Sequence, residues 1–411
     1  MTDSEDVVLI TVDSLRADHC GFMGYDEDVT PTLDDLAEEG LVFENAIAPA
    51  PETNSSVTTM FTGHYPNPDR EWDADEVMPD IQRHMWTRHT LPERFRELGY
   101  ETAGFTANPW TSRYFDFDRD FDHFVDTMDE NATSELMDDR RNGGVANLVV
   151  APILNWWQDQ NMFMSWERLY EGILEWVEDV ESPYFLWIFL VDVHMPYLPP
   201  DEYRTHSRLL TYPANGSLFL ENLDLPLQSP FHDVLVRTYD DSIRYTDAFL
   251  EQFVDDVDGD PLIAVVGDHG EEFGENGVYG HGSKVSETAL HVPFVVANGP
   301  SANVERPVSL RRMPELLTAL ATDGSYEHVL EPTVRGRNYD PAVAVRGTRW
   351  RYEWRESGEK VEVRHDDSWE ERSIPELERI GRELVDEHLE WERERTRIHE
   401  AAADVSRIEA L

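Results

Sequence analysis

The sequence has few lysines, a single cysteine and no long apolar run. Lys284 and Lys360 are its only lysines, and arginine is therefore the main basic residue. The lone Cys20 excludes an internal disulfide framework. No apolar run approaches the roughly 20 residues of a membrane-spanning helix, and the opening stretch MTDSEDVVLITVD lacks the basic region and cleavage site of a secretory signal. We therefore expect a soluble, cytoplasmic protein without a membrane span.

The charge is strongly shifted toward acidic side chains. The chain carries 34 basic and 84 acidic residues, a formal net charge of −50. Such a charge strains a compact fold by self-repulsion, which molar salt screens because the Debye length falls to roughly 3 Å. The acidic residues are spread along the whole chain, which favours an acidic, halophilic-type surface over a site for cations or a basic partner. Nucleic-acid binding is not expected, because contacts with phosphates require basic patches.

The apolar segments indicate an α/β fold. Near-continuous apolar runs at 6–13, 184–194, 261–270 and 291–299 are typical of strands covered on both faces, and a weaker run lies at 99–108. Helical segments such as TPTLDDLAEEG and TLPERFRELG, each with a Thr start and a Gly stop, separate these runs. This alternation predicts a mostly parallel central sheet with helices on both faces.

We expect three successive parts in the chain. Residues 1–335 form the large α/β domain, and 336–373 form a small C-terminal antiparallel sheet with a hairpin signal at Ser357-Gly358. Residues 374–411 form a highly charged helix, expected to serve in packing or as an oligomer arm.

Two segments interrupt the α/β pattern. Residues 198–232 are rich in proline and are expected to form a loop that shapes a pocket entrance. Residues 131–180 are expected to be a helical insertion. Its apolar side chains at helical spacing indicate core packing, with a lid over an apolar substrate group as the alternative: Phe163, Trp166, Tyr170, Ile173 and Val177.

Polar side chains follow three of the apolar runs. The first run ends in Asp13, the second in Asp192 and His194, and the third in Asp268 and His269. In open α/β sheets, ligands bind outside the carboxyl ends of the strands. A lone Asp in this position is usually a turn former, but a buried strand rarely ends in a cluster such as DHGEE without a compensating cation. Two carboxylates and an imidazole at one edge would suit a divalent metal.

Five segments follow one another in a recognisable order. They are VVLITVDSLRADHCGFMGY, TPTLDDLAEEGLVFENAIAPAPETNSSVTTMFTGHYP, LPERFRELGYETAGFTAN, FLVDVHMPYLPP and VVGDHGEEFGENGVYGHGSKVSETALHVPFVV. In this order they resemble the sulfatase family of the alkaline phosphatase superfamily. The resemblance covers roughly residues 5–335 and implies an alkaline-phosphatase-like catalytic domain.

The resemblance implies a metal site and a substrate site. Asp13 and Asp268 would be carboxylate ligands of a divalent cation, and His269 would take the neighbouring ligand position. Ca²⁺, Mg²⁺, Mn²⁺ and Zn²⁺ are not distinguished. The substrate site would use four further side chains, with His194 on the leaving oxygen or the charged ester group and the other three on the ester anion: His194, His281, Lys284 and Asn108. For His281, a role as a loop cap is the alternative.

The segment APETNSSVTTMFTGHYP, at 50–66, holds the candidate nucleophiles: Thr53, Ser55, Ser56, Thr58, Thr59 and Thr62. The family's nucleophile lies ten residues before the Gly of a Thr-Gly pair, which places it at Thr53. A residue that enters a helix faces free N–H groups and the positive end of the dipole. A metal bound to its oxygen would lower the pKa of the hydroxyl further, so Thr53 is also a candidate metal ligand. The alternative is that these hydroxyls only cap the helix.

Departures from the family pattern bear on the reaction. Ser55 and Val57 replace the Pro and Arg that formylglycine-forming enzymes recognise, and Ser14 stands where a second Asp is common. Thr53 cannot become formylglycine, so a covalent intermediate must be hydrolysed at sulfur or phosphorus. We therefore expect a metal-dependent hydrolase of small-molecule or glycan sulfate or phosphate esters. The alternatives are a phosphotransferase acting on a glycan or lipid head group, and a non-catalytic binding protein that retains the fold.

Overall fold

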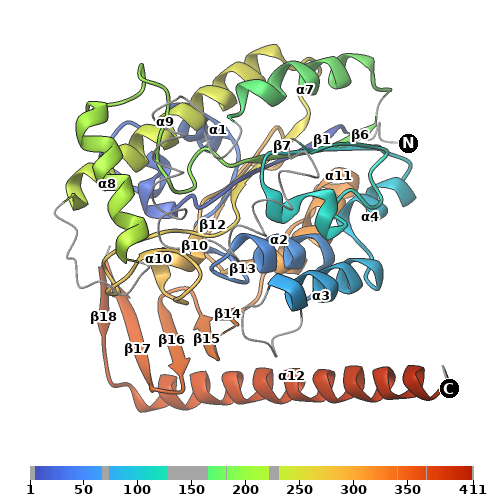
Figure 1. Cartoon of the computed structure of the whole chain (residues 1–411), viewed down its shortest axis with the longest axis vertical. Helices are drawn as coiled ribbons and strands as arrows, with labels where there is room; N and C mark the ends of the chain where they lie inside the picture. Colours follow the sequence, from blue (N-terminus) through green and yellow to red (C-terminus); the bar gives the residue numbers. More distant parts are fainter. Residues whose placement is uncertain are drawn as a thin grey trace.

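The structure, a computed structural model, is built around one large central sheet (Figure 1). It describes residues 5–66, 74–126, 165–181, 183–221, 231–339, 341–366 and 368–409. Within these residues the sheet has eight strands in the order β12-β2-β11-β7-β1-β6-β4-β5. Their bounds, in that order, are Ala302–Val304, Leu41–Phe43, Phe294–Ala297, Leu262–Gly267, Val7–Val12, Tyr184–Leu190, Glu101–Thr106 and His123–Asp126.

Most neighbouring strands of this sheet run parallel. The central strand β1 pairs in parallel with β6 and β7, and β4 pairs in parallel with β5 and β6. Only β11, among the described strands of this sheet, runs antiparallel to its neighbours β7 and β2. The predicted α/β fold with a mostly parallel sheet is confirmed. Because β6, β1 and β7 are parallel neighbours, their carboxyl ends meet at one edge of the sheet.

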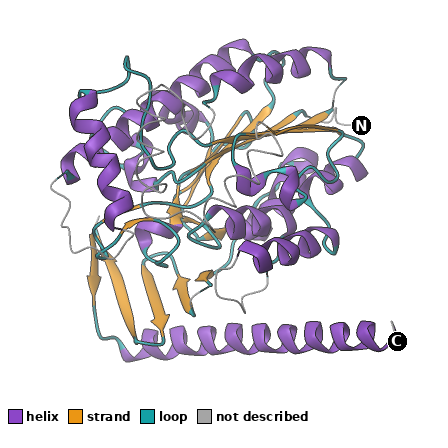
Figure 2. Cartoon of the chain, in the orientation of Figure 1, coloured by secondary structure: helices purple, strands orange, loops and turns teal. Residues whose placement is uncertain are grey.

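Helices cover both faces of the sheet (Figure 2). In β1, Val7 and Leu9 face one apolar layer, whereas Val8 and Ile10 face the other. The first layer is covered by α2 (Thr53–Thr62), α3 (Ala74–Trp86), α4 (Leu91–Glu97) and α11 (Met313–Asp323). The second is covered by α1 (Pro31–Glu39), α7 (Glu167–Asp179), α8 (Arg208–Glu221) and α9 (His232–Asp256). The sheet is therefore buried on both sides, as its continuous apolar strands predict.

The apolar run at 291–299 divides at Pro293. Its first part, β10 (His291–Val292), pairs with β3 (Ala46–Ile47), which also pairs with β13 (Val308–Ser309) in a small separate sheet. Its second part is β11 of the central sheet. Proline has no N–H to donate to a strand ladder, so one continuous strand is interrupted here. A further pair, β8 (Glu272–Phe273) and β9 (Tyr279–Gly280), precedes the short helix α10 (Glu287–Leu290).

A five-stranded antiparallel sheet follows the α/β part of the chain. Its strands are β14 (Val334–Asn338), β15 (Ala342–Arg346), β16 (Trp350–Arg355), β17 (Gly358–His365) and β18 (Ser368–Glu371). The long helix α12 (Pro375–Glu409) runs along this sheet (Figure 1). Buried Tyr352 and Val385 belong to the apolar layer between them. The predicted small sheet, its hairpin and the terminal helix are confirmed, whereas the domain boundaries and the oligomer role of the helix stay predictions.

The Pro-rich segment 198–232 is not one loop. Residues Arg208–Glu221 form α8, which contains Pro213 and buries Ala214 and Leu218 one turn apart. The proline content masked this helical spacing, so the prediction of a loop was wrong for this part. Residues 222–230 lie outside the described residues.

The predicted insertion is described only from residue 165 onward. There α7 begins, and Trp166, Tyr170 and Ile173 pack in the apolar layer above the sheet. This arrangement confirms core packing for these three side chains, while Phe163 and the rest of 131–164 lie outside the described residues. Among the residues that the structure describes, no helix combines the length and the apolar character needed to cross a bilayer.

Candidate active site

The polar groups at the strand ends converge on one buried cluster. Asp13 follows β1, and Asp268 and His269 follow the neighbouring strand β7. One ligand atom from each of the three side chains lies within 4.8 Å of the other two, and all three side chains are fully buried. The parallel pairing of β1 and β7 thus brings together residues that are more than half of the chain apart.

The two carboxylates of this cluster need a positive partner. Asp268 Oδ1 accepts hydrogen bonds from the backbone N–H groups of Ser14, at 3.0 Å, and His269, at 2.8 Å. Asp268 Oδ2 is buried without a hydrogen-bond partner in the described part of the chain. Burial, together with the charge of Asp13, raises the pKa of Asp268 well above its usual value. No Lys or Arg among the described residues pairs with either carboxylate, so the site fits a divalent cation.

His269 is prepared to act as a nitrogen ligand. Its Nδ1–H donates to the carbonyl of Gly270 at 2.8 Å, which leaves the lone pair on Nε2. Nε2 lies 3.6 Å from Asp13 Oδ1 and 3.6 Å from Asp268 Oδ2. Burial, reinforced by nearby His281, lowers the pKa of His269 to about 4 and keeps the ring neutral at pH 7. A neutral imidazole between two carboxylates suits Zn²⁺ or Mn²⁺ as readily as the oxygen-preferring cations.

Asp13 is held by two neutral donors. The hydroxyl of Ser14 donates to Asp13 Oδ1 at 3.0 Å, and the amide of Asn108 donates to Asp13 Oδ2 at 2.6 Å. The Asn108 Oδ1 in turn accepts from the backbone N–H of Trp110 at 2.8 Å. Asn108 was predicted to contact substrate, and the structure places its amide against Asp13. Here it fixes the orientation of a candidate ligand.

Thr53 enters the same cluster from helix α2. It is the first residue of the helix, is 4% exposed, and its Oγ1 lies 3.2 Å from His269 Nε2. The hydroxyl of Ser56, one turn further, donates to the backbone carbonyl of Asp268 at 2.6 Å and ties the helix to the strand end. The amino end of α2, with its free N–H groups, therefore lies next to the candidate metal ligands.

Glu52 directly precedes Thr53 and is the N-cap residue of α2, although its side chain makes no capping hydrogen bond to the helix backbone. Its Oε1 accepts a hydrogen bond from the Ser55 hydroxyl. Burial raises the pKa of Glu52 to about 7, although Ser55, Arg337 and His281 each lower it.

His281 pairs with Glu271 beside the cluster. Its Nδ1 lies 3.1 Å from Oε1 of Glu271, whose Oε2 accepts from the Tyr197 hydroxyl at 2.9 Å. Burial alone would lower the pKa of His281, but the Glu271 carboxylate outweighs it and raises the pKa. The same pairing lowers the pKa of Glu271 against the effect of burial. The alternative role of His281 as a loop cap gives no reason for this pair, and the geometry favours a cationic imidazole at the site.

His194 and Lys284 lie near His281: the His194 ring packs against the His281 ring, and Lys284 follows His281 closely in the chain. The rings of His194 and His269 both pack against that of His281, with centroids 4.8 and 4.6 Å from it. His194 Nδ1 donates to the carbonyl of Met195, and burial lowers its pKa, so its Nε2 is an acceptor at neutral pH. Lys284 is half-buried in the loop after β9, and no ion pair joins it to a described residue.

Sequence reasoning missed three contributors to this geometry. They are Ser14, Glu52 and Glu271, which lie next to or near predicted site residues in the sequence. Their hydrogen-bond partners are Asp268, Ser55 and His281, and only the folded chain shows these pairs. The acidic run DHGEE was the one signal that could have pointed to Glu271.

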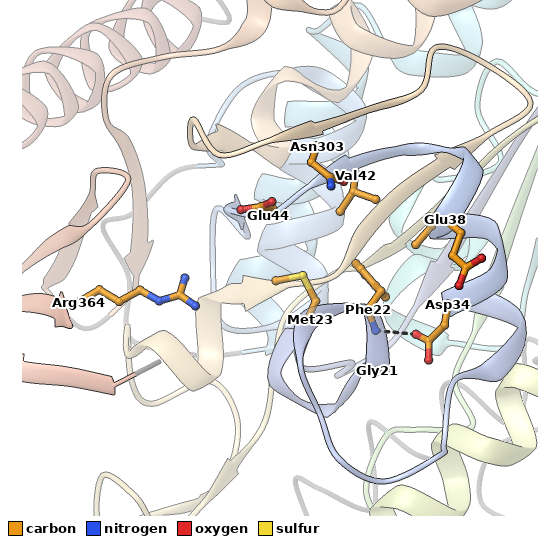
Figure 3. Close-up of a pocket in the computed structure, with 10 residues that line it drawn as sticks. Gly21, Phe22, Met23, Asp34, Glu38, Val42, Glu44, Asn303 and Arg364 are labelled. Carbon is orange, nitrogen blue, oxygen red and sulfur yellow. Dashed lines mark hydrogen bonds between the residues drawn. The ribbon is translucent and has the colours of Figure 1, made fainter. Parts of the chain in front are cut away.

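A cavity of about 530 Å³ is lined by other residues (Figure 3). It opens between α1, β2, β12 and the turn at 21–23, and Arg364 of β17 faces it. Asp34 on its wall already accepts from the backbone N–H of Phe22 at 2.8 Å. None of the residues that line this cavity belongs to the cluster of Asp13, Asp268 and His269.

Residues 5–310 match the sequence profile of the family described as Sulfatase. The chain belongs to the sulfatase family. Iduronate 2-sulfatase from Homo sapiens is 23% identical to this sulfatase-family chain over 339 residues, which are 72% of the chain and 60% of the relative. The chain thus spans about 60% of the length of that curated relative.

Solved structures share the fold of this sulfatase-family chain. The phosphonate monoester hydrolase of Agrobacterium radiobacter superposes with a TM-score of 0.63 at 16% identity, covering 95% of this chain and 96% of that one. The C-terminal periplasmic domain of EcEptC from Escherichia coli, solved in complex with Zn, has a TM-score of 0.53 at 16% identity, covering 81% and 85%. These matches confirm the alkaline-phosphatase-like fold.

Proposed function

We propose that this sulfatase-family chain is a metal-dependent hydrolase that cleaves phosphate or sulfate esters with Thr53 as its nucleophile. The observation that carries the proposal is the position of Thr53 Oγ1, 3.2 Å from His269 Nε2 at the edge of the Asp13–Asp268–His269 cluster. The names of its relatives, a sulfatase and a phosphonate monoester hydrolase, support ester cleavage at sulfur or phosphorus.

The residues of the cluster fit a divalent cation. Asp13, Asp268 and His269 would hold it, and the orphaned Asp268 Oδ2 supports this assignment. The Zn complex of EcEptC is consistent with a metal in this fold. When bound, the cation would neutralise the paired carboxylates, polarise the ester oxygens and favour the ionised form of a neighbouring hydroxyl.

The reaction of the chain's own groups would proceed in two steps. In the first, the Thr53 hydroxyl gives its proton to solvent and its oxygen attacks phosphorus or sulfur, while the bond to the alcohol breaks and the alcohol leaves with a proton from the His281 imidazolium. Glu271 stabilises that imidazolium before the proton is given up. In the second, the neutral His281 takes a proton from a water molecule, the water oxygen displaces the Thr53 oxygen from phosphorus or sulfur, and the Thr53 oxygen regains a proton from solvent. The neutral His194, with Nε2 as an acceptor, would orient the alcohol or the water.

The nucleophile bears on the choice between sulfate and phosphate. Thr53 has one hydroxyl, so its ester cannot collapse by expelling the anion as an aldehyde hydrate can. Hydrolysis at the central atom is the remaining route, and metal-assisted water attack on phospho-threonine is the familiar form of it. We therefore expect phosphoesters to be turned over faster than sulfate esters.

The test compares hydrolysis of p-nitrophenyl phosphate, bis-p-nitrophenyl phosphate and p-nitrophenyl sulfate by wild type, Thr53→Ser and Thr53→Ala, purified in high salt with bound metal measured in each. We expect Thr53→Ala to keep its metal and lose turnover by about 1,000-fold or more. Thr53→Ser should retain activity, and mass spectrometry should find an acid-stable ester at position 53 in both this variant and the wild type. Equal turnover by wild type and Thr53→Ala would refute the assigned nucleophile.

A further inference from the structure

Glu52 is a carboxylate beside the proposed nucleophile that lacks a cation of its own. It directly precedes Thr53, and no Lys, Arg or His of the described residues forms an ion pair with it. Its only hydrogen bond to a described residue is the one that Oε1 accepts from Ser55, so Oε2 is left to other partners. A partly buried carboxylate without a positive partner is costly to keep in a fold.

The basic residues around Glu52 are committed elsewhere. Arg337 acts on Glu52 electrostatically, but its Nε lies 3.1 Å from Oε1 of Glu392 and its guanidinium donates to the carbonyl of Pro66. His281 is held by Glu271. Each of these cations already faces a carboxylate of its own.

The other acidic groups of the site are likewise accounted for. Asp13 and Asp268 face the place of the cation, and Glu271 faces His281. Glu52 therefore remains as the one carboxylate of this site, among the described residues, that has neither an ion-pair partner nor a place beside the cation. No described residue supplies a positive partner for this carboxylate.

We propose that Glu52 binds an ammonium group carried by the alcohol portion of the substrate, so that this enzyme selects esters of amino alcohols. The inference rests on the proposed function, because Thr53 marks where the ester group sits. Glu52 directly precedes Thr53 and interacts electrostatically with His281, the proposed proton donor to the alcohol, so its carboxylate lies on the side of the site where the alcohol leaves. Ser55, which interacts with both Glu52 and the Tyr339 phenol, fixes the carboxylate in this position. A charge-assisted hydrogen bond from an ammonium would satisfy Oε2.

The same carboxylate should repel acidic substrates. An alcohol with a carboxylate next to the ester would bring a second negative charge against Glu52. Like charges in a partly desolvated site cost free energy that neutral alcohols avoid.

The test measures binding, so that it does not depend on turnover. Three matched phosphate monoesters, 2-aminoethyl, ethyl and carboxymethyl phosphate, are titrated calorimetrically into Mn²⁺-loaded Thr53→Ala protein at the lowest salt that keeps it folded. We expect 2-aminoethyl phosphate to bind about tenfold tighter than ethyl phosphate, and carboxymethyl phosphate to bind more weakly than either. Adding Glu52→Gln should abolish these ratios. The control is Glu101→Gln, which makes the same charge change. Glu101 is exposed at the amino end of β4, away from the site, so this substitution should leave the affinity ratios intact.

The outcomes separate the two proposals. Equal binding of the three esters, or ratios that survive Glu52→Gln, would overturn the ammonium subsite while leaving Thr53 chemistry standing. A uniform loss of affinity for all three esters in Glu52→Gln would also overturn it, because Glu52 would then support the site rather than select its ligand. An intact preference in a wild-type protein that hydrolyses none of the three esters would sustain the subsite and refute the hydrolase.

Discussion

At Asp13, two neutral side chains orient a carboxylate before any ligand arrives. Ser14 and Asn108 donate to its two oxygens, at 3.0 and 2.6 Å. Neutral donors orient the carboxylate without neutralising its negative charge. An Arg or Lys in the same place would neutralise that charge and leave less of it to attract a cation. Asn108 thus holds a side chain of the candidate metal site in position by a hydrogen bond.

Asn108→Ala should therefore weaken metal binding. We expect the affinity for Mn²⁺ to fall by about 10- to 100-fold, the usual effect of losing such a supporting hydrogen bond. The matched control is Asn54→Ala, since Asn54 is equally buried but donates to the carbonyl of Trp110 at 3.0 Å. Titration with Mn²⁺ measures both, and equal affinities in the two variants would show that Asn108 has no such role.

Site residues that directly follow a strand were easier to predict from the sequence than site residues in other positions. Asp13, Asp268 and His269 were placed together from sequence because parallel strands must end at one edge. Thr53 was placed from a family spacing, and the structure brings it to the same cluster. Glu52 carried no such signal, because only the fold reveals that no cation reaches it.

Helices whose sequences carry typical capping residues were predicted well, whereas helices without such residues were not. Thr90 caps α4 through a reciprocal bond with Glu93, and its sequence shows this plainly. By contrast, α8 contains Pro213 and begins without such a signal, so its residues resemble a loop. The position of α12 under the C-terminal sheet depends on tertiary contacts that no local pattern encodes.

Two helical glycines test the packing of these elements. Gly381 lies where α12 crosses the sheet, and a Cβ there would come within 2.2 Å of the Tyr352 ring. At Gly172, an exposed position of α7, the nearest atom would be 3.8 Å away, on Phe105. Alanine in a helix normally stabilises relative to glycine by about 1 kcal/mol, so only the clash distinguishes the two sites.

We expect Gly172→Ala to stabilise the protein by up to about 1 kcal/mol and Gly381→Ala to destabilise it by about 1 to 3 kcal/mol through overpacking. Urea unfolding of both variants at one fixed salt concentration measures the free energies. If Gly381→Ala were as stable as Gly172→Ala, α12 would not pack against Tyr352 as described.

Over the whole molecule, repulsion between acidic side chains opposes the stabilisation that comes from the buried apolar side chains. The formal net charge of −50 is spread over 411 residues, and many ion pairs lie on exposed surface, where each contributes little. Screening should therefore help the fold more than it harms these pairs.

The unfolding temperature should rise with salt. Between 0.1 and 2 M NaCl, as the Debye length shrinks from about 10 Å to below about 3 Å, we expect a gain of about 2 kcal/mol or more, or roughly 2 °C or more for a chain of this length. Calorimetry measures the shift, and sucrose at matched osmolality is the control because it carries no charge. A midpoint that falls or stays constant in NaCl would contradict an acidic surface adapted to salt.

The proposed chemistry depends on a cation seated between Asp13 and Asp268 beside Thr53. Crystals grown with Mn²⁺ and measured near the manganese absorption edge would locate this cation. We expect one strong anomalous peak within bonding distance of Asp13, Asp268 and His269 Nε2, and its loss in Asp268→Asn. A protein that hydrolyses esters in the presence of chelator, with no anomalous peak at these side chains, would show that the reaction does not use a metal held there.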